Sequence, residues 1–182
     1  SNNIQVRALV SQDTTIFAGT LNDGVFRYTG SGTTWSQINN GLTHTRVWTL
    51  AINNETIFAG TLGGGVYRSV DKGENWCQVN NGLTEYNVRA FAKIDTNLFV
   101  GIQNGGVFRS TNNGTTWVSA NNLFLNSAVY ALTAVGNSLF AGGLGGIQRT
   151  TDNGENWNPV YRGLTSSRFW SLGTHLGTVY AG

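Results

Sequence analysis

Two pairs of carboxylates in this sequence have the residue types and the spacing that acid–base or metal chemistry would need. Asp71 is followed three residues later by Glu74, and Asp152 is followed three residues later by Glu155. Paired carboxylates can act as general acid and base, and clustered carboxylate oxygens can hold a divalent cation. Both pairs, however, stand inside copies of one short polar turn. A catalytic or metal site is normally singular, so the repetition favours a structural role for these acids.

The turn occurs four times and ends each time in a tryptophan. Its copies are YTGSGTTW at 28–35, SVDKGENW at 69–76, STNNGTTW at 110–117 and TTDNGENW at 150–157. A short carboxylate or amide can accept hydrogen bonds from its own turn, glycine can adopt positive φ, and a buried tryptophan can fix the hairpin. We therefore interpret the turn as scaffold and expect its four tryptophans to occupy equivalent, largely buried sites. The structural residues are Asp71, Gly73, Trp76, Asn112, Trp117, Asp152, Trp157 and Trp35.

These turns mark a repeat of about 41 residues. The tryptophans are spaced 41, 41 and 40 residues apart, and the runs TIFAG, TIFAG, NLFVG, SLFAG and TVYAG keep the same step. Each unit shows four short runs with strand composition, separated by turn residues, and no segment has helical periodicity. Four antiparallel strands repeated at this length are typical of a β-propeller, in which blades bury their faces against their neighbours. The sequence therefore predicts an all-β propeller.

Because the repeat runs through the whole chain, we interpret residues 1–182 as a single propeller segment. The expected blades are about 5–40, 46–81, 87–122 and 128–162, and a half blade covers 168–182. A half blade would leave an apolar strand edge unpaired, which folded proteins avoid because it invites aggregation. We therefore expect the segment to be part of a larger ring, completed by more repeats of the same chain or by a second copy.

Composition excludes several classes of function. Charged residues make up 11%, the formal net charge is +2, and no basic run occurs, so a nucleic-acid partner is not expected. The single cysteine, Cys77, and two isolated histidines, His44 and His175, predict neither a disulfide framework nor a metal site. The glycine-rich run at 142–146 lacks the strand-then-helix context of a phosphate loop, so no cofactor is expected. No apolar stretch approaches the roughly 20 residues of a membrane span.

The repeated turn resembles the Asp-box of the BNR-repeat propellers, Ser/Thr-x-Asp-x-Gly-x-x-Trp, found in sialidase-like enzymes and in Asp-box assembly factors. The second and fourth copies match fully, whereas Asn112 and Gly30 replace the aspartate in the third and first. The resemblance implies that the turn joins the third and fourth strands of each blade. It also implies that ligand sites lie on the opposite face, at the loops from fourth strand to first and from second to third.

On that face, one position in the first strand of each blade holds large polar and aromatic residues, and neighbouring loops add others. The candidate ligand-binding residues are Arg7, Arg46, Trp48, Tyr86, Arg89, Tyr130, Arg168 and Trp170. Aromatic faces beside guanidinium groups can stack on sugar rings or bind anionic and peptide groups. The alternative interpretation is that these side chains only fill the channel and the seams between blades.

Another set of arginines recurs at one position near the end of every third strand, which favours a structural role. We expect these side chains to tie a blade or its hairpin to the neighbouring blade. They are Arg27, Arg68, Arg109 and Arg149.

Catalysis is not the favoured interpretation. Glycoside hydrolysis normally requires two placed carboxylates, and only Asp23 and Glu85, in different blades, are expected on the ligand face. The sequence instead favours a non-enzymatic, secreted interaction module, extracellular or periplasmic, that presents a face to a protein or glycan ligand. A lectin-like glycan-binding propeller and a fragment of a sialidase-like glycoside hydrolase are the two alternatives.

Overall fold

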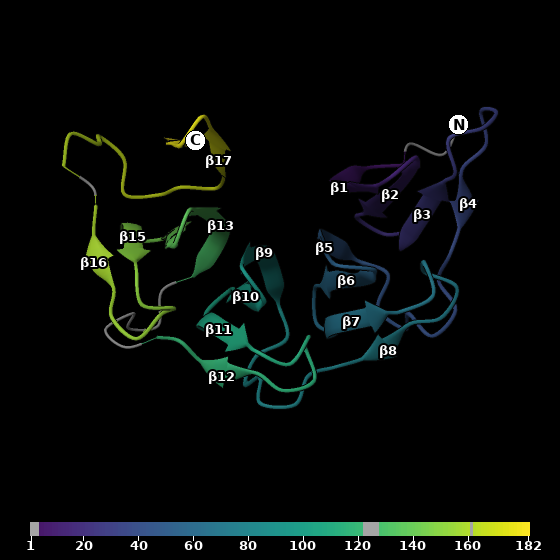
Figure 1. Cartoon of the computed structure of the whole chain (residues 1–182), viewed down its shortest axis with the longest axis horizontal. Coiled ribbons are helices and arrows are strands. Elements are labelled where there is room, and N and C mark those ends of the chain that lie inside the picture. Colours follow the sequence, from purple (N-terminus) through teal and green to yellow (C-terminus); the bar gives the residue numbers. More distant parts are fainter. Residues whose placement is uncertain (1–3, 122–127, 161) are drawn as a thin grey trace. The chain divides into compact units, whose positions relative to one another are not determined.

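The computed structural model describes residues 4–121, 128–160 and 162–182, so residues 122 and 161 of two expected blades lie outside the description. In these ranges all eighteen regular elements are β-strands. They form four four-stranded antiparallel sheets and one two-stranded sheet (Figure 1). The predicted fold, all-β with four full blades and part of a fifth, is confirmed. By contacts the chain divides into two compact units, residues 1–80 with 86–88 and residues 81–85 with 89–182.

Blades 1 and 2 make up unit 1. Blade 1 contains β1 (Val6–Gln12), β2 (Thr15–Thr20), β3 (Val25–Tyr28) and β4 (Ser36–Gln37). Blade 2 contains β5 (Val47–Asn53), β6 (Thr56–Thr61), β7 (Gly65–Ser69) and β8 (Cys77–Gln78). Each sheet follows chain order, and its fourth strand is only two residues long.

Unit 2 holds most of blade 3, all of blade 4 and the partial blade 5. Blade 3 contains β9 (Val88–Ile94), β10 (Asn97–Ile102), β11 (Gly106–Ser110) and β12 (Val118–Ser119). Blade 4 contains β13 (Val129–Val135), β14 (Ser138–Gly143), β15 (Gly146–Thr150) and β16 (Asn158–Pro159). The partial blade contains β17 (Leu172–His175) and β18 (Thr178–Ala181).

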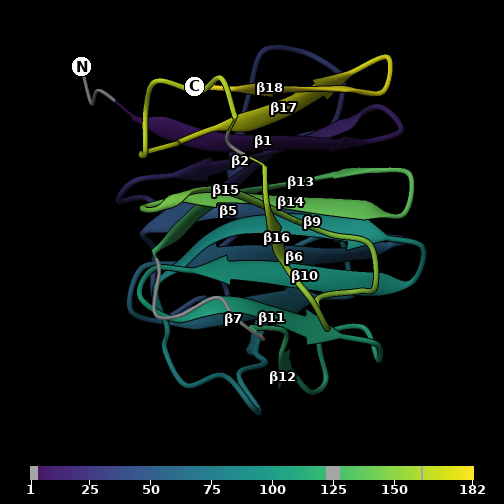
Figure 2. The same cartoon turned by 90° about the vertical axis from the view of Figure 1, so that its left-hand side faces the viewer.

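The antiparallel strand order places the connections at two opposite ends of each sheet. Turns between strands one and two share an end with the repeated turns between strands three and four. In unit 2, Figure 2 shows the β13–β14 and β17–β18 turns pointing to the same side. Loops between strands two and three, and the entry into the first strand, lie at the other end, which we call the loop end.

The core of unit 1 lies between its two blades. We call the face of a blade that meets the following blade its forward face, and the opposite one its back face. The forward face of blade 1 contributes Phe17, Val25, Ile38 and Leu42, and the back face of blade 2 contributes Val47, Leu50, Ile57, Ala59, Tyr67 and Trp76. Gly19 makes this approach possible, because an added Cβ would lie 2.6 Å from Val47 Cγ1.

Unit 2 repeats the same packing. Phe99, Val107 and Ala120 of blade 3 meet Val129, Leu132, Leu139, Ala141 and Trp157 of blade 4. The forward face of blade 4 is partly covered by the partial blade, since a Cβ on Gly142 would lie 3.2 Å from Phe169 and 3.3 Å from Leu172. Within each unit, the facing sheets therefore bury the apolar side chains that alternate strand positions place between them.

Candidate functional site

The carboxylate of the repeated turn is fully engaged by the turn itself. In the second copy, Ser69 Oγ donates to Asp71 Oδ1 at 2.7 Å, and Asn75 donates its backbone N–H to Oδ1 at 2.9 Å and its amide to Oδ2 at 2.8 Å. The backbone N–H of Gly73 donates to Ser69 Oγ at 2.8 Å. Thr150, Asp152 and Asn156 repeat this arrangement in the fourth copy. Both oxygens of each aspartate thus accept hydrogen bonds that close the hairpin.

These hydrogen bonds stabilise the charged form of both aspartates. The Asn75 side chain, the Asn75 backbone N–H and Ser69 lower the pKa of Asp71 from 3.8 to about 2. Thr150 and then Asn156 lower the pKa of Asp152 to about 2. At neutral pH neither group carries a proton to donate, so neither can act as a general acid.

The third copy forms the same turn without a carboxylate. Asn112 Oδ1 accepts hydrogen bonds from the backbone N–H of Thr116 at 2.9 Å and from Ser110 Oγ at 3.0 Å. Its Nδ2 donates to Thr116 Oγ1 at 2.8 Å. Because an amide oxygen does the work of a carboxylate here, the turn requires an acceptor and no negative charge.

Three of the four turn tryptophans are buried, and the fourth corrects the expectation of equivalence. Trp76 is 5% exposed and donates its indole N–H to the carbonyl of Ile38 in the preceding blade at 2.8 Å. Trp157 makes the same bond to Ala120, and Trp117 is also buried. Trp35, in contrast, is 42% exposed and packs on Tyr28, with ring centroids 5.5 Å apart. Trp76 and Trp157 are buried against the blade before their own, and none of the described residues takes that place for Trp35.

The glutamates of the turns face arginines of the preceding blade. Arg27 of blade 1 donates to the carbonyl of Lys72 at 3.1 Å and forms an ion pair with Glu74 at 2.7 Å. Arg109 of blade 3 donates in the same way to Asn153 at 3.2 Å and lies 3.7 Å from Glu155. These two arginines therefore tie their blades to the next hairpin, as the recurrence of the residue predicts. Arg149 instead donates to Ser138 within its own blade at 3.1 Å and 2.9 Å.

In unit 1, the variable first-strand position brings a cation and an aromatic ring together. The guanidinium carbon of Arg7 lies 4.9 Å from the ring centroid of Trp48, which is a cation–π contact. Arg46 and Tyr86 are exposed at the same loop end of blade 2. Their backbone carbonyls accept hydrogen bonds from the loop between β6 and β7, at 2.9 Å from Leu62 to Arg46 and 3.1 Å from Gly63 to Tyr86.

In unit 2, the same position forms a continuous row of three side chains. Trp170 stacks on Tyr130, with ring centroids 4.4 Å apart and an interplanar angle of 22°. Arg89 lies over the Tyr130 ring at 5.9 Å, and its guanidinium is held by Gln103 Oε1, which accepts from Arg89 Nε at 2.9 Å and also from Nη2. Trp170 is 61% exposed. We call Arg89, Tyr130 and Trp170 the stacked row.

A β-bulge explains why this position differs from its neighbours along the strand. The pairing register shifts between Val6 and Ala8, between Val47 and Thr49, and between Val129 and Ala131. The residue skipped in each case is Arg7, Trp48 or Tyr130. A bulge adds an unpaired residue and re-aims its side chain. The bulges were not predicted from the sequence, although a large polar or aromatic residue interrupting an apolar strand is the signal that marks them.

In the last repeat, the regular part of the first strand begins later than in the other blades. β17 begins only at Leu172, and the backbone N–H groups of Trp170 and Ser171 both donate to the carbonyl of Gly182, at 2.8 Å and 3.1 Å. Two donors on one carbonyl leave Trp170 outside the regular ladder, as the bulge does in the other blades. Arg168 is exposed and pairs with Leu144 in an isolated bridge. Its neighbours 164–167 line a cleft of about 430 Å³ with Gly145 and Gly146.

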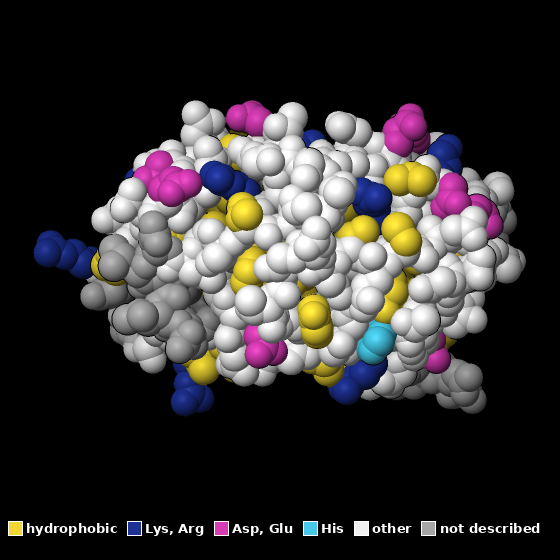
Figure 3. Space-filling model, turned by 90° about the horizontal axis from the view of Figure 1, so that it is seen from below, with side chains coloured by type: hydrophobic (Ala, Val, Ile, Leu, Met, Phe, Trp, Pro, Cys, Tyr) yellow, Lys and Arg dark blue, Asp and Glu magenta, His cyan; other side chains and the backbone are white. Residues whose placement is uncertain are grey.

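The remaining acids do not form a pair within either unit at the loop end. Asp23 belongs to unit 1 and Glu85 to unit 2. Among the residues that the structure describes, no group of three His, Cys, Asp or Glu side chains could hold a metal ion. Basic and acidic side chains are interspersed on the face shown in Figure 3, without a large patch of one sign. The described part of the chain has no helix long and apolar enough to cross a membrane.

Comparison with known proteins identifies the fold. No protein-family model and no curated protein sequence matches this chain. The extracellular domain of BT4673 from B. thetaiotaomicron is similar over 98% of this chain and 26% of its own, with a TM-score of 0.81 and 17% identity. An ancestral GH74 enzyme is similar over 86% of this chain and 24% of its own (TM-score 0.69, 21% identity). YCF48 bound to D1 peptide is similar over 99% of this chain and 62% of its own (TM-score 0.70, 18% identity).

This chain therefore spans between about a quarter and less than two thirds of the length of these structures. The neighbours differ in what their names say of them, an extracellular domain, an enzyme and a peptide-binding protein. What they share with this chain is its architecture, and the chain has the fold of a β-propeller, with four full blades and part of a fifth.

Proposed function

We propose that this chain is a non-enzymatic interaction module of a secreted protein, extracellular or periplasmic, and that the loop end of its blades binds a protein or other ligand. The observation that carries the proposal is the stacked row of unit 2. Three side chains that can bind ligands, from three successive repeats, lie in a row there, because Tyr130 interacts with both Arg89 and Trp170. Arg7 and Trp48 supply a second, matching pair in unit 1.

The stacked row is suited to binding because contacts within the protein already hold its side chains in place. Gln103 holds the guanidinium of Arg89, and the Tyr130 ring interacts with both Arg89 and Trp170. A ligand that meets such a surface needs to order few side chains, so less of the interaction energy is lost on binding. Aromatic and arginine side chains are also the types that most often dominate the energy of interfaces.

The same proposal assigns the repeated turn to the scaffold, as an Asp-box of the BNR type. The hydrogen bonds of Asp71, Asp152 and Asn112 support this assignment, because each closes its own hairpin. The ion pairs of Glu74 and Glu155 with arginines of the preceding blade support it too. Four of the nine acidic residues thereby have structural roles, so few carboxylates are left as candidate catalytic groups.

The names of two similar structures each support one part of this proposal. One is named as an extracellular domain and another as a protein bound to a peptide. The GH74 neighbours are enzymes, so a fragment of a glycoside hydrolase is the competing assignment. It would require a pair of carboxylates at the reacting bond, and neither unit offers one at its loop end.

A glycan is the second candidate ligand, and one observation favours it. Trp170 is stacked on Tyr130 through one ring face and is 61% exposed, so part of its indole is open to solvent. A flat aromatic surface supported from behind suits the apolar face of a sugar ring.

Calorimetric titration with two sets of probes tests both ligands. The probes are neutral and sialylated oligosaccharides, and short peptides with and without acidic side chains. Binding of a peptide or sugar that is lost in Trp170→Ala and retained in Tyr180→Ala, an exposed aromatic of β18 outside the row, would support the proposal. Hydrolysis of any oligosaccharide that persists in Trp170→Ala, or binding that is equal in both variants, would contradict it.

A further inference from the structure

A hydrogen-bonded cluster of three side chains lies at the loop end of blade 2. Tyr67 belongs to the core of unit 1 and is 1% exposed, and its hydroxyl lies 2.8 Å from His44 Nδ1 and 2.7 Å from Thr43 Oγ1. Thr43 Oγ1 and His44 Nδ1 are 3.2 Å apart. Thr43 and His44, in the connection from β4 to β5, are both exposed. The cluster therefore joins the end of the buried core to the surface.

The loop between β6 and β7 leaves room for the imidazole ring of His44. A Cβ added at Gly64 would lie 2.5 Å from His44 Cγ and 2.7 Å from its Nδ1. Gly63 and Gly65 have positive φ, whereas Gly64 does not. Position 64 therefore needs a glycine for space, because any side chain there would displace the ring. Hydrogen bonds on one side and the Gly64 backbone on another hold His44 in one place.

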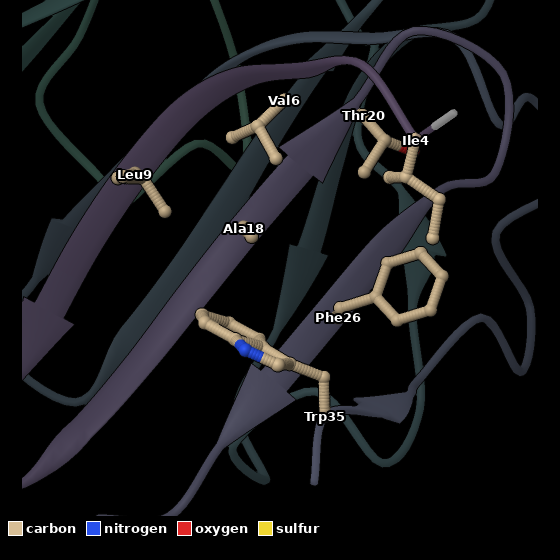
Figure 4. A pocket seen from close by; sticks show the side chains of 7 residues that line it. All are labelled: Ile4, Val6, Leu9, Ala18, Thr20, Phe26 and Trp35. Atoms are coloured by element: carbon tan, nitrogen blue, oxygen red, sulfur yellow. The ribbon is translucent and has the colours of Figure 1, made fainter. Parts of the chain in front are cut away.

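The cluster is particular to blade 2. One repeat earlier and one repeat later, the position of Tyr67 holds Phe26, which Figure 4 shows, and Phe108, and neither ring has a hydroxyl. The position of His44 holds Glu85 one repeat later. The fold of a blade thus does not require the hydroxyl, whereas the orientation of His44 does. A feature that occurs in one repeat and is not needed for the fold is a candidate for function.

Because Nδ1 is held, Nε2 is the polar atom of His44 that is available to a ligand. The two nitrogens lie on opposite sides of the imidazole ring, so Nε2 points away from Tyr67, and it has no hydrogen-bond partner among the described residues. When a ligand accepts a hydrogen bond from Nε2–H, Tyr67 can donate its hydroxyl hydrogen to Nδ1, and Thr43 can donate to the Tyr67 oxygen. Every member of the cluster then has a partner.

The charged side chains at this loop end favour an anionic group as the acceptor. Arg46, two residues after His44, accepts a hydrogen bond at its carbonyl from the loop between β6 and β7 at 2.9 Å. Arg46 and Arg7 are exposed at the loop end of unit 1, and Asp23 is the exposed acidic residue there. Two arginines against one aspartate leave a positive balance, which attracts anions and strengthens their hydrogen bonds.

We propose that His44 is a ligand-contacting residue of the loop end, where its Nε2–H donates to a carboxylate of the bound ligand. Tyr67 is then a positioning residue, since it acts only through His44. This inference rests on the proposed function, that the loop end binds a ligand, and adds the chemical group that unit 1 recognises. Two sources supply such a carboxylate, an acidic side chain of a peptide and an acidic sugar.

An NMR titration of the full chain tests the contact directly. The probes are a capped tripeptide with a central glutamate and an oligomer of galacturonic acid. Their neutral counterparts are the same tripeptide with glutamine and the methyl ester of the oligomer. The ring-proton signals of His44 should shift more with one acidic probe than with its neutral counterpart, and that probe identifies the source. His175, exposed at the end of β17 that lies away from the loop end, is the internal control and should not shift.

Variants measure how much the contact contributes to binding. His44→Ala should weaken binding of the acidic probe at least about 10-fold and leave the neutral counterpart nearly unchanged, because a charge-assisted hydrogen bond is lost. The matched control, His175→Ala, should leave both affinities unchanged. Tyr67→Phe keeps the packing that Phe26 and Phe108 show in other blades, and it should weaken the acidic probe about 3- to 10-fold. Circular dichroism and urea unfolding check that each variant is folded.

The possible outcomes separate this inference from the proposed function. An acidic probe that binds the wild type and His44→Ala equally would overturn the inference. Binding that is lost in Trp170→Ala but leaves the His44 signals unshifted would overturn it too, while the proposed function stands. A loss of stability in Tyr67→Phe without a change in affinity would show that the cluster is only structural. If none of the four probes binds, both proposals fail.

Discussion

At the scale of single residues, hydrogen bonding decides what the two turn aspartates can do. Asp71 accepts three hydrogen bonds from Ser69 and Asn75, and its pKa is lowered from 3.8 to about 2. A group whose pKa is lower in the folded than in the unfolded protein stabilises the fold at pH values above its pKa in the unfolded protein. That stabilisation is lost as the pH falls through the folded value. For both aspartates the window therefore lies between about pH 4 and pH 2.

We predict that Asp71→Asn lowers stability slightly at neutral pH and removes part of the loss between pH 4 and pH 2. Asn112 already serves in the third copy, so the amide supports the turn but cannot titrate. The reverse change, Asn112→Asp, is the matched control and should add to the loss in the same window. Urea unfolding midpoints measured from pH 2 to pH 7 check both. A ligand-binding defect in Asp71→Asn without any change in stability would instead point to a functional carboxylate.

A second prediction at this scale compares two tryptophans. Trp76→Ala should cost about 3–5 kcal/mol, because it leaves a cavity and an unpaired carbonyl at Ile38. Trp170→Ala should cost about 1 kcal/mol, the value of a stacked aromatic pair, because the side chain is largely exposed. Chemical denaturation of both variants gives the comparison. Equal losses would show that burial does not distinguish the two sites.

At the scale of elements, the strand pattern could be predicted because it is local. Runs such as TIFAG place alternate side chains on opposite faces, and turn residues separate them at regular spacing. The hydrogen bonds of the turn follow from Asp71 and Gly73 in the same way. The exposure of Trp35 could not be predicted from its own turn, since it depends on the presence or absence of a preceding blade.

The contacts among the candidate site residues were not predicted from the sequence, and their role in binding stays a prediction. The side chains at Arg89, Tyr130 and Trp170 were expected at the loop end, but their mutual contact depends on how far successive blades turn. The bulge at Tyr130 depends on the register with β14, which propensity does not determine. The composition of a strand therefore indicates which position varies, but it does not determine the conformation of the residue at that position.

Strand glycines provide a prediction for the packing of elements. Gly19→Ala should destabilise by about 1–3 kcal/mol, because the added Cβ would stand 2.6 Å from Val47 and 3.3 Å from Leu50. Gly173→Ala, in β17, meets nothing within 4 Å and should be neutral or slightly stabilising. Melting temperatures of the two variants decide. If Gly19→Ala and the wild type have the same melting temperature, then the blades of unit 1 are not in the close contact described.

At the scale of the whole molecule, burial is unevenly distributed. Each unit has its own apolar core, whereas blade 1 leaves its back face exposed.

The bulges of blades 1, 2 and 4 place a residue that can vary in sequence where it does not contribute to strand pairing. Because the bulged residue is left out of the ladder, its side chain can change while the pairing of the strand on either side is kept. Arginine, tryptophan and tyrosine already occupy this place in three blades of the same shape. A combinatorial library randomised only at Arg7, Trp48 and Tyr130 should therefore yield many folded variants with different recognition properties. The repeat would then serve as a binding scaffold whose specificity can be changed by substituting one residue in each blade.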